Sequence, residues 1–164
     1  MRILLLGSAI ALGFSLFLTP LFIRLFAKIG WGQFIRQDGP KTHYVKRGTP
    51  TMGGIVILLA VVAGYFGAHL IEGEMPSPSG LLVVGLMVGL GLVGFLDDFS
   101  KIRRQQSLGL SPRGKVIGQL AVSVAFAWGS VSFPDENGIT PAAQGISVVR
   151  GADLVSFVEW GYWA

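Results

Sequence analysis

Residues 75–96 read MPSPSGLLVVGLMVGLGLVGFL, a stretch of 22 residues without a charged side chain that is followed at once by Asp97 and Asp98. A helix needs about 20 mostly apolar residues to cross the ~30 Å hydrocarbon core of a bilayer. This stretch therefore predicts a transmembrane helix, and its abrupt end places two carboxylates at the membrane boundary. Because the backbone in lipid must satisfy its own hydrogen bonds, a single span of this kind is helical.

Three further segments of similar length also lack charged side chains. Together the four segments predict spans at about residues 3–23, 52–71, 76–96 and 116–133. The chain is 51% hydrophobic and 13% charged, whereas soluble domains carry about 25% charged residues. This composition excludes a soluble or disordered protein. We therefore expect an all-α, polytopic membrane protein with a single membrane domain over residues 1–164.

The first segment has a second interpretation, a secretory signal peptide with Arg2 as its basic start. Its 21 uncharged residues exceed the ~7–15 residues of a typical signal-peptide core. The stronger basic cluster, which includes Arg24 and Lys28, follows the segment instead of preceding it. Both features favour a transmembrane helix.

The basic residues predict the orientation in the membrane. Of the 13 Lys and Arg residues, six lie within residues 24–51 and five within residues 97–115. Basic loops between spans mark the cytoplasmic side, so we expect these two loops in the cytoplasm and the N-terminus outside. The same clustering explains the net charge of +4 without a nucleic-acid partner. The other two connections are acidic or neutral, as external loops should be.

Residues 153–164 become apolar again and carry aromatic side chains that suit a membrane interface. Two interpretations stay open for this segment: an interfacial helix, or the start of a truncated fifth span.

The first basic loop leads into the second span through Gly53 and Gly54, which leave backbone N–H groups at a helix entrance. The hydroxyls of Thr49 and Thr51 are candidate N-caps. Helix N-termini favour anions such as phosphate, and Lys46 adds positive charge beside this one. The pattern predicts either a phosphate site at the membrane surface or an ordinary basic loop before a capped helix.

Asp97 and Asp98 end the third predicted span, where the helix dipole disfavours an acid by roughly 0.3–1 kcal/mol. Because adjacent carboxylates also repel each other, the pair needs a cation. Mg²⁺ is typically held by one or two carboxylates together with substrate phosphates. Nearby Lys and Arg side chains, including Lys101 and Lys115, offer the alternative. Both basic loops face one side, so they could converge on one phosphate-rich ligand; otherwise the acids only mark the end of the span.

Three motifs in these loops are Asp38-Gly-Pro-x-x-His43, Lys46-x-Gly-Thr-Pro-Thr-Met-Gly-Gly54 and Gly94-Phe-x-Asp97-Asp98-Phe-x-Lys101. Together they resemble the phospho-N-acetylmuramoyl-pentapeptide transferases, a family of polyprenyl-phosphate phosphosugar transferases. The second motif is long and highly specific, whereas two adjacent Asp residues alone would be a weak signal. The resemblance covers about residues 1–134.

The resemblance implies an enzyme of peptidoglycan synthesis that moves phospho-MurNAc-pentapeptide from UDP to undecaprenyl phosphate, forming lipid I and releasing UMP. It implies dependence on Mg²⁺, action at the cytoplasmic face of the bacterial inner membrane, and a homodimer. By motif, Asp97 and Asp98 would be the catalytic pair and could help to hold the metal. The implied substrate-binding residues are Lys46, Thr51, Lys101 and Lys115.

Members of this family have more spans and place further active-site residues, including the principal Mg²⁺ ligand, in later cytoplasmic loops. We therefore expect a truncated chain that is inactive alone. Two other hypotheses stay open: a related polyprenyl-phosphate transferase that uses another UDP-sugar, and a non-catalytic membrane remnant or packing protein.

Overall fold

The computed structural model describes residues 1–31, 52–106, 108–134, 138, 140–142, 145–149 and 152–156. Four helices occupy most of this part of the chain: α1 (Arg2–Ile29), α2 (Gly54–Glu72), α3 (Pro78–Arg104) and α4 (Pro112–Ser132). An antiparallel pair of strands follows, β1 (Gly145–Val149) and β2 (Ala152–Ser156).

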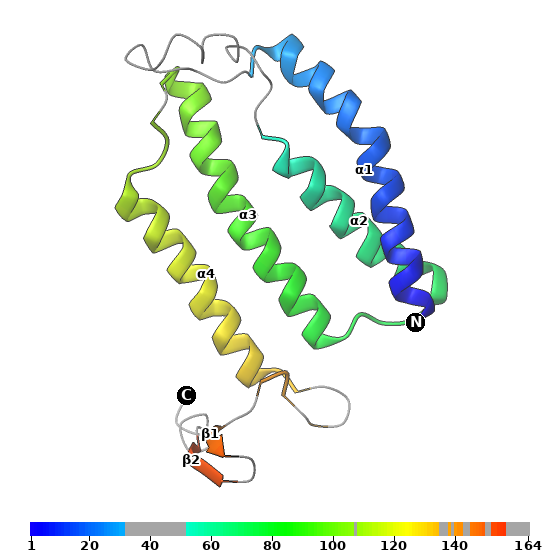
Figure 1. Ribbon diagram of the computed structural model, residues 1–164, viewed down its shortest axis with the longest axis vertical. Coiled ribbons are helices and arrows are strands. Elements are labelled where there is room, and N and C mark those ends of the chain that lie inside the picture. Colours follow the sequence, from blue (N-terminus) through cyan, green and yellow to red (C-terminus); the bar gives the residue numbers. More distant parts are fainter. Residues whose placement is uncertain are drawn as a thin grey trace.

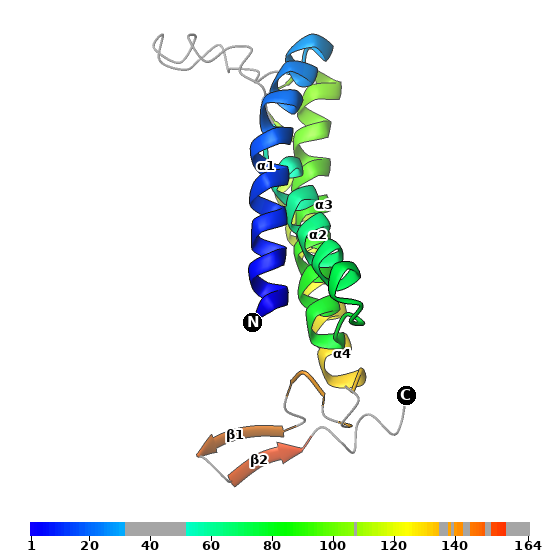
Figure 2. The ribbon, with the colours of Figure 1, turned by 90° about the vertical axis from the view of Figure 1, so that its right-hand side faces the viewer.

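The helices alternate in direction, so that α1 and α3 end at one end of the bundle while α2 and α4 end at the other (Figure 1). Figure 2 shows that they stand in one narrow layer, with the hairpin beyond the end of α4. The helix ends that carry the predicted cytoplasmic charges, those of α1 and α3, therefore lie at the same end of the bundle.

All four helices are long and apolar enough to cross a membrane, which confirms the prediction of a helical, polytopic membrane protein. Their surfaces support the same conclusion. Leu4, Phe17, Leu70 and Trp128 are between 64% and 84% exposed. A soluble protein rarely exposes so much contiguous apolar surface, whereas lipid solvates it. The chain is an integral membrane protein.

Helix α3 is longer than the uncharged stretch that predicted it, because it continues eight residues past Leu96 to Arg104. Asp97 therefore lies about two turns inside the helix and not at its end. The helix dipole acts mainly within the last turn, and that turn carries Lys101, Arg103 and Arg104. The expected dipole penalty on the acids is wrong: the charge pattern marks the edge of the apolar span, not the end of the helix.

The lengths of the helices explain why their charged ends lie outside the apolar layer. With 28 and 27 residues, α1 and α3 are about 42 and 40 Å long at 1.5 Å per residue. Helix α2 has 19 residues, about 28 Å, which roughly matches the hydrocarbon core. The last turns of α1 and α3 therefore extend beyond the start of α2.

Helices α3 and α4 begin with the same local motif. Ser77 precedes Pro78 and its side chain accepts a hydrogen bond from the N–H of Gly80 at 3.2 Å. Ser111 does the same for Gly114, also at 3.2 Å. A Ser N-cap followed by Pro at the first helical position fixes the start of a helix.

Small residues let α1 and α2 approach closely. A Cβ atom on Gly64 would lie 2.5 Å from the carbonyl oxygen of Gly7 and 2.9 Å from the Cβ of Ala11. Ala60 and Ala68 of the same helix are 2% and 0% exposed. Helices in lipid associate by close backbone packing of this kind, so Gly64 is at the tightest point of this pair.

Glycines also set the register of α3 and α4. Three of them each receive a branched side chain from the facing helix: Gly89 faces Val122, Gly118 faces Val93, and Gly129 faces Leu82. The contacts are spaced seven and four residues apart on both helices, in opposite order, as an antiparallel pair requires. Another step of four brings Asp97 to the level of Gly114, at the start of α4. Gly85 has open space around it.

The tail differs from both interpretations of residues 153–164. Residues 153–156 belong to strand β2, which pairs with β1 through Ile146–Val155 and Gly145–Ser156, with irregular register toward the turn. Valine and isoleucine favour extended backbone, which accounts for a strand where the apolar composition indicated a helix. Residues 157–164 lie outside the described part.

Replacing Gly64 with Ala should lower the melting temperature of the detergent-solubilised chain, because the added methyl group collides with the backbone of α1. Overpacking typically costs about 1–3 kcal/mol. Gly13→Ala is the matched control, since nothing lies within 4 Å of a Cβ at that position. Equal melting temperatures for the two variants would contradict the close approach of α1 and α2.

Candidate functional site

The carboxylate of Asp97 lies between α3 and the start of α4 and is held by three donors. Its Oδ1 atom accepts the backbone N–H of Leu110 at 2.8 Å and lies 3.0 Å from the Nζ atom of Lys115. Its Oδ2 atom lies 2.8 Å from the Nζ atom of Lys101. The Asp97 side chain is only 13% exposed. Charge-assisted hydrogen bonds from several donors offset the cost of burying such a group.

Gly109 makes this arrangement possible. A Cβ atom at this position would overlap the carboxylate and the carbonyl oxygen of Asp97. The chain before α4 can therefore pass directly over Asp97 and present the N–H of Leu110 to it. The packing of glycines between α3 and α4 sets the register that brings Asp97 to the start of α4. The absence of a side chain at Gly109 leaves room for the Asp97 carboxylate.

Asp98 has a different environment from Asp97. Its side chain is 37% exposed, and the structure records one partner for it, the Nζ atom of Lys101 at 2.7 Å from Oδ1. Lys101 therefore bridges both acids and keeps a third N–H for another acceptor. The two negative charges of Asp97 and Asp98 are balanced by the two positive charges of Lys101 and Lys115. The neighbouring Arg103 and the other basic residues of this end give it an excess of positive charge.

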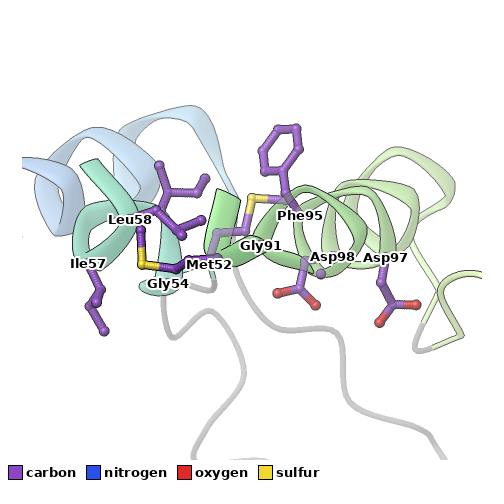
Figure 3. Close-up of a pocket in the computed structure, with 11 residues that line it drawn as sticks. Met52, Gly54, Ile57, Leu58, Gly91, Phe95, Asp97 and Asp98 are labelled. Atoms are coloured by element: carbon purple, nitrogen blue, oxygen red, sulfur yellow. The ribbon is translucent and has the colours of Figure 1, made fainter. Parts of the chain in front are cut away.

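A cavity of about 430 Å³ opens between the start of α2 and α3, with the two acids at one end (Figure 3). Its wall from α2 includes Met52, Gly54 and Leu58, and its wall from α3 is also mainly apolar. An apolar cavity with charged groups at one end has the amphipathic character of a lipid with a polar head group. Its charged lining residues are both acids, so the positive charge at this end comes from Lys101, which contacts both of them.

The start of α2 lies on the wall of this cavity. Its N-cap is Gly53, which makes no side-chain cap hydrogen bond, so neither Thr49 nor Thr51 is the N-cap residue. Met52, just before it, is 6% exposed and has a positive φ of 70°. The N–H groups of Ile55 and Val56 donate to the carbonyl oxygens of Met52 and Gly53, both at 3.1 Å, so the start of this helix is closed by its own backbone.

The two acids fit a magnesium ion to different degrees. Both oxygens of Asp97 already accept from lysine or backbone donors. Asp98 has one recorded partner and borders the cavity, and a single carboxylate combined with substrate phosphates is a usual Mg²⁺ arrangement. Within the described residues, no cluster of three or more His, Asp or Glu side chains could hold a metal ion.

The structure brings together four of the six residues that the sequence indicated: Asp97, Asp98, Lys101 and Lys115. Lys46 and Thr51 lie outside the described residues. Sequence reasoning gave no role to the N–H of Leu110 or to Gly109. Gly109 and the Ser111-Pro112 pair could have indicated a tight turn of the chain before the fourth helix. They could not have indicated that this turn contacts Asp97.

Comparison with known proteins supports the resemblance. Residues 46–58 match the family model described as phospho-N-acetylmuramoyl-pentapeptide-transferase signature 1. A protein named phospho-N-acetylmuramoyl-pentapeptide-transferase from Clavibacter michiganensis is 55% identical over 92% of this chain and 42% of its own length. One of the same name from Saccharopolyspora erythraea is 50% identical over 99% of this chain and 45% of its own length.

A third relative of this name, from Beutenbergia cavernae, is 53% identical over 96% of this chain and 47% of its own length. The chain thus spans somewhat less than half the length of these curated relatives and corresponds to an N-terminal part of them. No solved structure matches the chain.

Gly109→Ala should displace the Asp97 carboxylate and loosen α3 from α4. We expect Gly109→Ala and Asp97→Asn each to lower the free energy of unfolding by about 1–3 kcal/mol, measured by SDS titration in mixed micelles. The double variant should lose little more than either single variant, because both remove the same contact. Gly85→Ala is the control, since that glycine has open space. Fully additive losses would show that Gly109 acts elsewhere.

Proposed function

Because the chain belongs to the phospho-N-acetylmuramoyl-pentapeptide transferase family over the length that it shares with its relatives, we propose that it forms the N-terminal part of a phosphosugar transferase. The proposed reaction moves phospho-MurNAc-pentapeptide from UDP to undecaprenyl phosphate and yields lipid I and UMP. The observation that carries this proposal is the cavity at the membrane boundary, apolar over most of its wall and bordered by Asp98.

The chemistry joins two anionic substrates. An oxygen of the lipid phosphate attacks the phosphorus atom next to the sugar; a new P–O bond forms, and the P–O bond to UMP breaks. Repulsion between the phosphates opposes this approach, so the site must supply positive charge where charge develops. The third N–H of Lys101, which has no acceptor among the described residues, lies at the end of α3 where that charge is needed, and so do the exposed Arg103 and Arg104.

The two acids take different roles in this proposal. Both acids border the cavity, and Asp98, which is more exposed and has one partner among the described residues, is the carboxylate that acts on the lipid phosphate. Asp97 positions it, because its own oxygens are engaged by Lys101, Lys115 and Leu110. Lys115 consequently supports the site through Asp97 instead of binding substrate directly.

Lys46 and Thr51 precede the start of α2 and are proposed to contact the substrates from the first loop. Mg²⁺ would be held by Asp98 together with phosphate oxygens, and it would reduce the negative charge on the phosphates. The homodimer implied by the family stays a prediction, and so does the lack of turnover by this chain alone.

Asp98→Asn should reduce UMP release at least 100-fold, because the amide cannot act as a base or as an anionic ligand. The assay uses a full-length protein in which this chain replaces the matching N-terminal part of the Saccharopolyspora erythraea relative. Glu74→Gln, at the opposite end of the bundle, is the control and should leave turnover unchanged. Normal turnover of Asp98→Asn would overturn the proposed role, and absence of turnover in the unmutated protein would overturn the reaction.

The proposed orientation places both basic segments in the cytoplasm of a bacterial cell. The chain has no cysteine, so single replacements can report the side of the membrane. Glu74→Cys should react with an impermeant maleimide added to intact spheroplasts, whereas Arg103→Cys should react only after lysis. The reverse labelling pattern would invert the topology and place Asp98 outside.

A further inference from the structure

Five aromatic rings form a continuous chain from α1 to α3 at the end of the bundle that carries Asp98. The distances between successive ring centroids are 5.3 Å for Phe22–Phe26, 5.4 Å for Phe26–Trp31, 6.0 Å for Trp31–Phe99 and 5.7 Å for Phe99–Phe95. All four lie within the range of attractive aromatic pairs. The chain of rings therefore links α1 to α3 past the start of α2.

The end of α1 explains how Trp31 reaches α3. Gly30 adopts the left-handed conformation with φ 78°, and the N–H of Trp31 donates to the carbonyl oxygen of Phe26 at 2.8 Å. This helix ending turns the chain back over its own last turn. The indole then stacks on Phe26, which is 5% exposed, and its edge meets Phe99 of α3.

Asp98 lies between two anchored neighbours on α3. On one side Asp97 is fastened to the start of α4 by Leu110 and Lys115. On the other side Phe99 is in ring contact with Trp31. Successive helical residues point about 100° apart, so these contacts restrain the end of α3 from two directions and set the direction of the side chain between them.

Rotation of this helix end would move the acid. A turn of about 20° displaces a group ~5 Å from the helix axis by nearly 2 Å. A misplacement of about 1 Å can reduce the rate of an enzyme roughly 100-fold. Helix α2 begins nearer the middle of the bundle than the end of α3 (Figure 1). It therefore offers little restraint on rotation of that helix end. The ring contact with α1 is therefore well placed to prevent the rotation.

We propose that Trp31 is a positioning residue, which holds the end of α3 so that Asp98 keeps its direction toward the cavity. This inference rests on the proposed function of Asp98. Trp31 does not line the cavity, and its ring partners are Phe26 and Phe99, so we assign its effect on Asp98 to its contact with Phe99.

A measurement on the chain itself tests the restraint without any assay of activity. Spin labels on Lys28→Cys and Arg103→Cys, both exposed in a chain without native cysteine, report the separation of the α1 and α3 ends by double electron–electron resonance. We expect a narrow distance distribution, broadening at least twofold with Trp31→Ala, and recovery with Trp31→Phe, which keeps a ring against Phe99. An unchanged distribution in Trp31→Ala overturns the proposal.

The chain offers a control of the same ring geometry that lies within α4 and its C-cap residue instead of between two helices. Trp128 and Phe133 form a ring contact at 6.0 Å and 78°, compared with 6.0 Å and 71° for Trp31 and Phe99. The control pair lies at the opposite end of the bundle. Trp128→Ala should therefore leave the distance distribution unchanged, and broadening in this variant would mean that loss of any such ring pair loosens the whole bundle.

Turnover of the full-length protein connects the restraint to the reaction. Trp31→Ala should lower kcat about tenfold or more with KM nearly unchanged, Trp31→Phe should restore most of it, and Trp128→Ala should behave as the unmutated protein. Broadening with normal turnover overturns the positioning role but leaves the function of Asp98 standing. Normal turnover of Asp98→Asn instead overturns the proposed function, whatever Trp31→Ala does to the distances.

Discussion

The carboxylate of Asp97 is the interaction on which this end of the molecule depends. It lies at the edge of the apolar layer, only 13% exposed, where an unpaired charge would be strongly unfavourable. Three donors satisfy it, one from its own helix and two from the segment that starts α4. The same contacts connect α3 to α4, draw the preceding chain over the helix, and leave Asp98 facing the cavity.

The membrane helices could be predicted from the sequence because the thickness of the bilayer sets the length of an uncharged span. Their pairing could not, since the spacing of glycines identifies a close-packing face but not the helix that fills it. Gly89 receives Val122, whereas Gly85, four residues earlier on the same side of the helix, has open space. The charge pattern also could not predict the residue at which α3 ends. Charged residues are compatible with a helix in water, so the helix continues past the apolar layer to Arg104.

The sequence could predict the charged side chains of the site, but it could not predict the contacts that the backbone makes there. Asp97, Asp98 and Lys101 were recognisable from their charges at a membrane boundary. The N–H of Leu110 has no sequence signature, because almost every residue has such a donor. The matched family signature, residues 46–58, gains a physical meaning in its described part: Met52, Ile57 and Leu58 line the cavity, and Leu58 packs on Gly91.

The proposed transfer of a phosphosugar from a water-soluble nucleotide to a lipid phosphate needs an apolar wall and a charged rim within one cavity. Helices no longer than the bilayer would place their ends at its surface and leave nothing to build the rim. Because α3 continues about two turns past its uncharged stretch, one rigid element supplies the apolar wall below and the acids and lysine above. A rigid element transmits rotation along its whole length, so its projecting end must be fixed from the side. The Asp97 contacts with α4 supply one restraint, and the aromatic contact with α1 supplies another from a different direction.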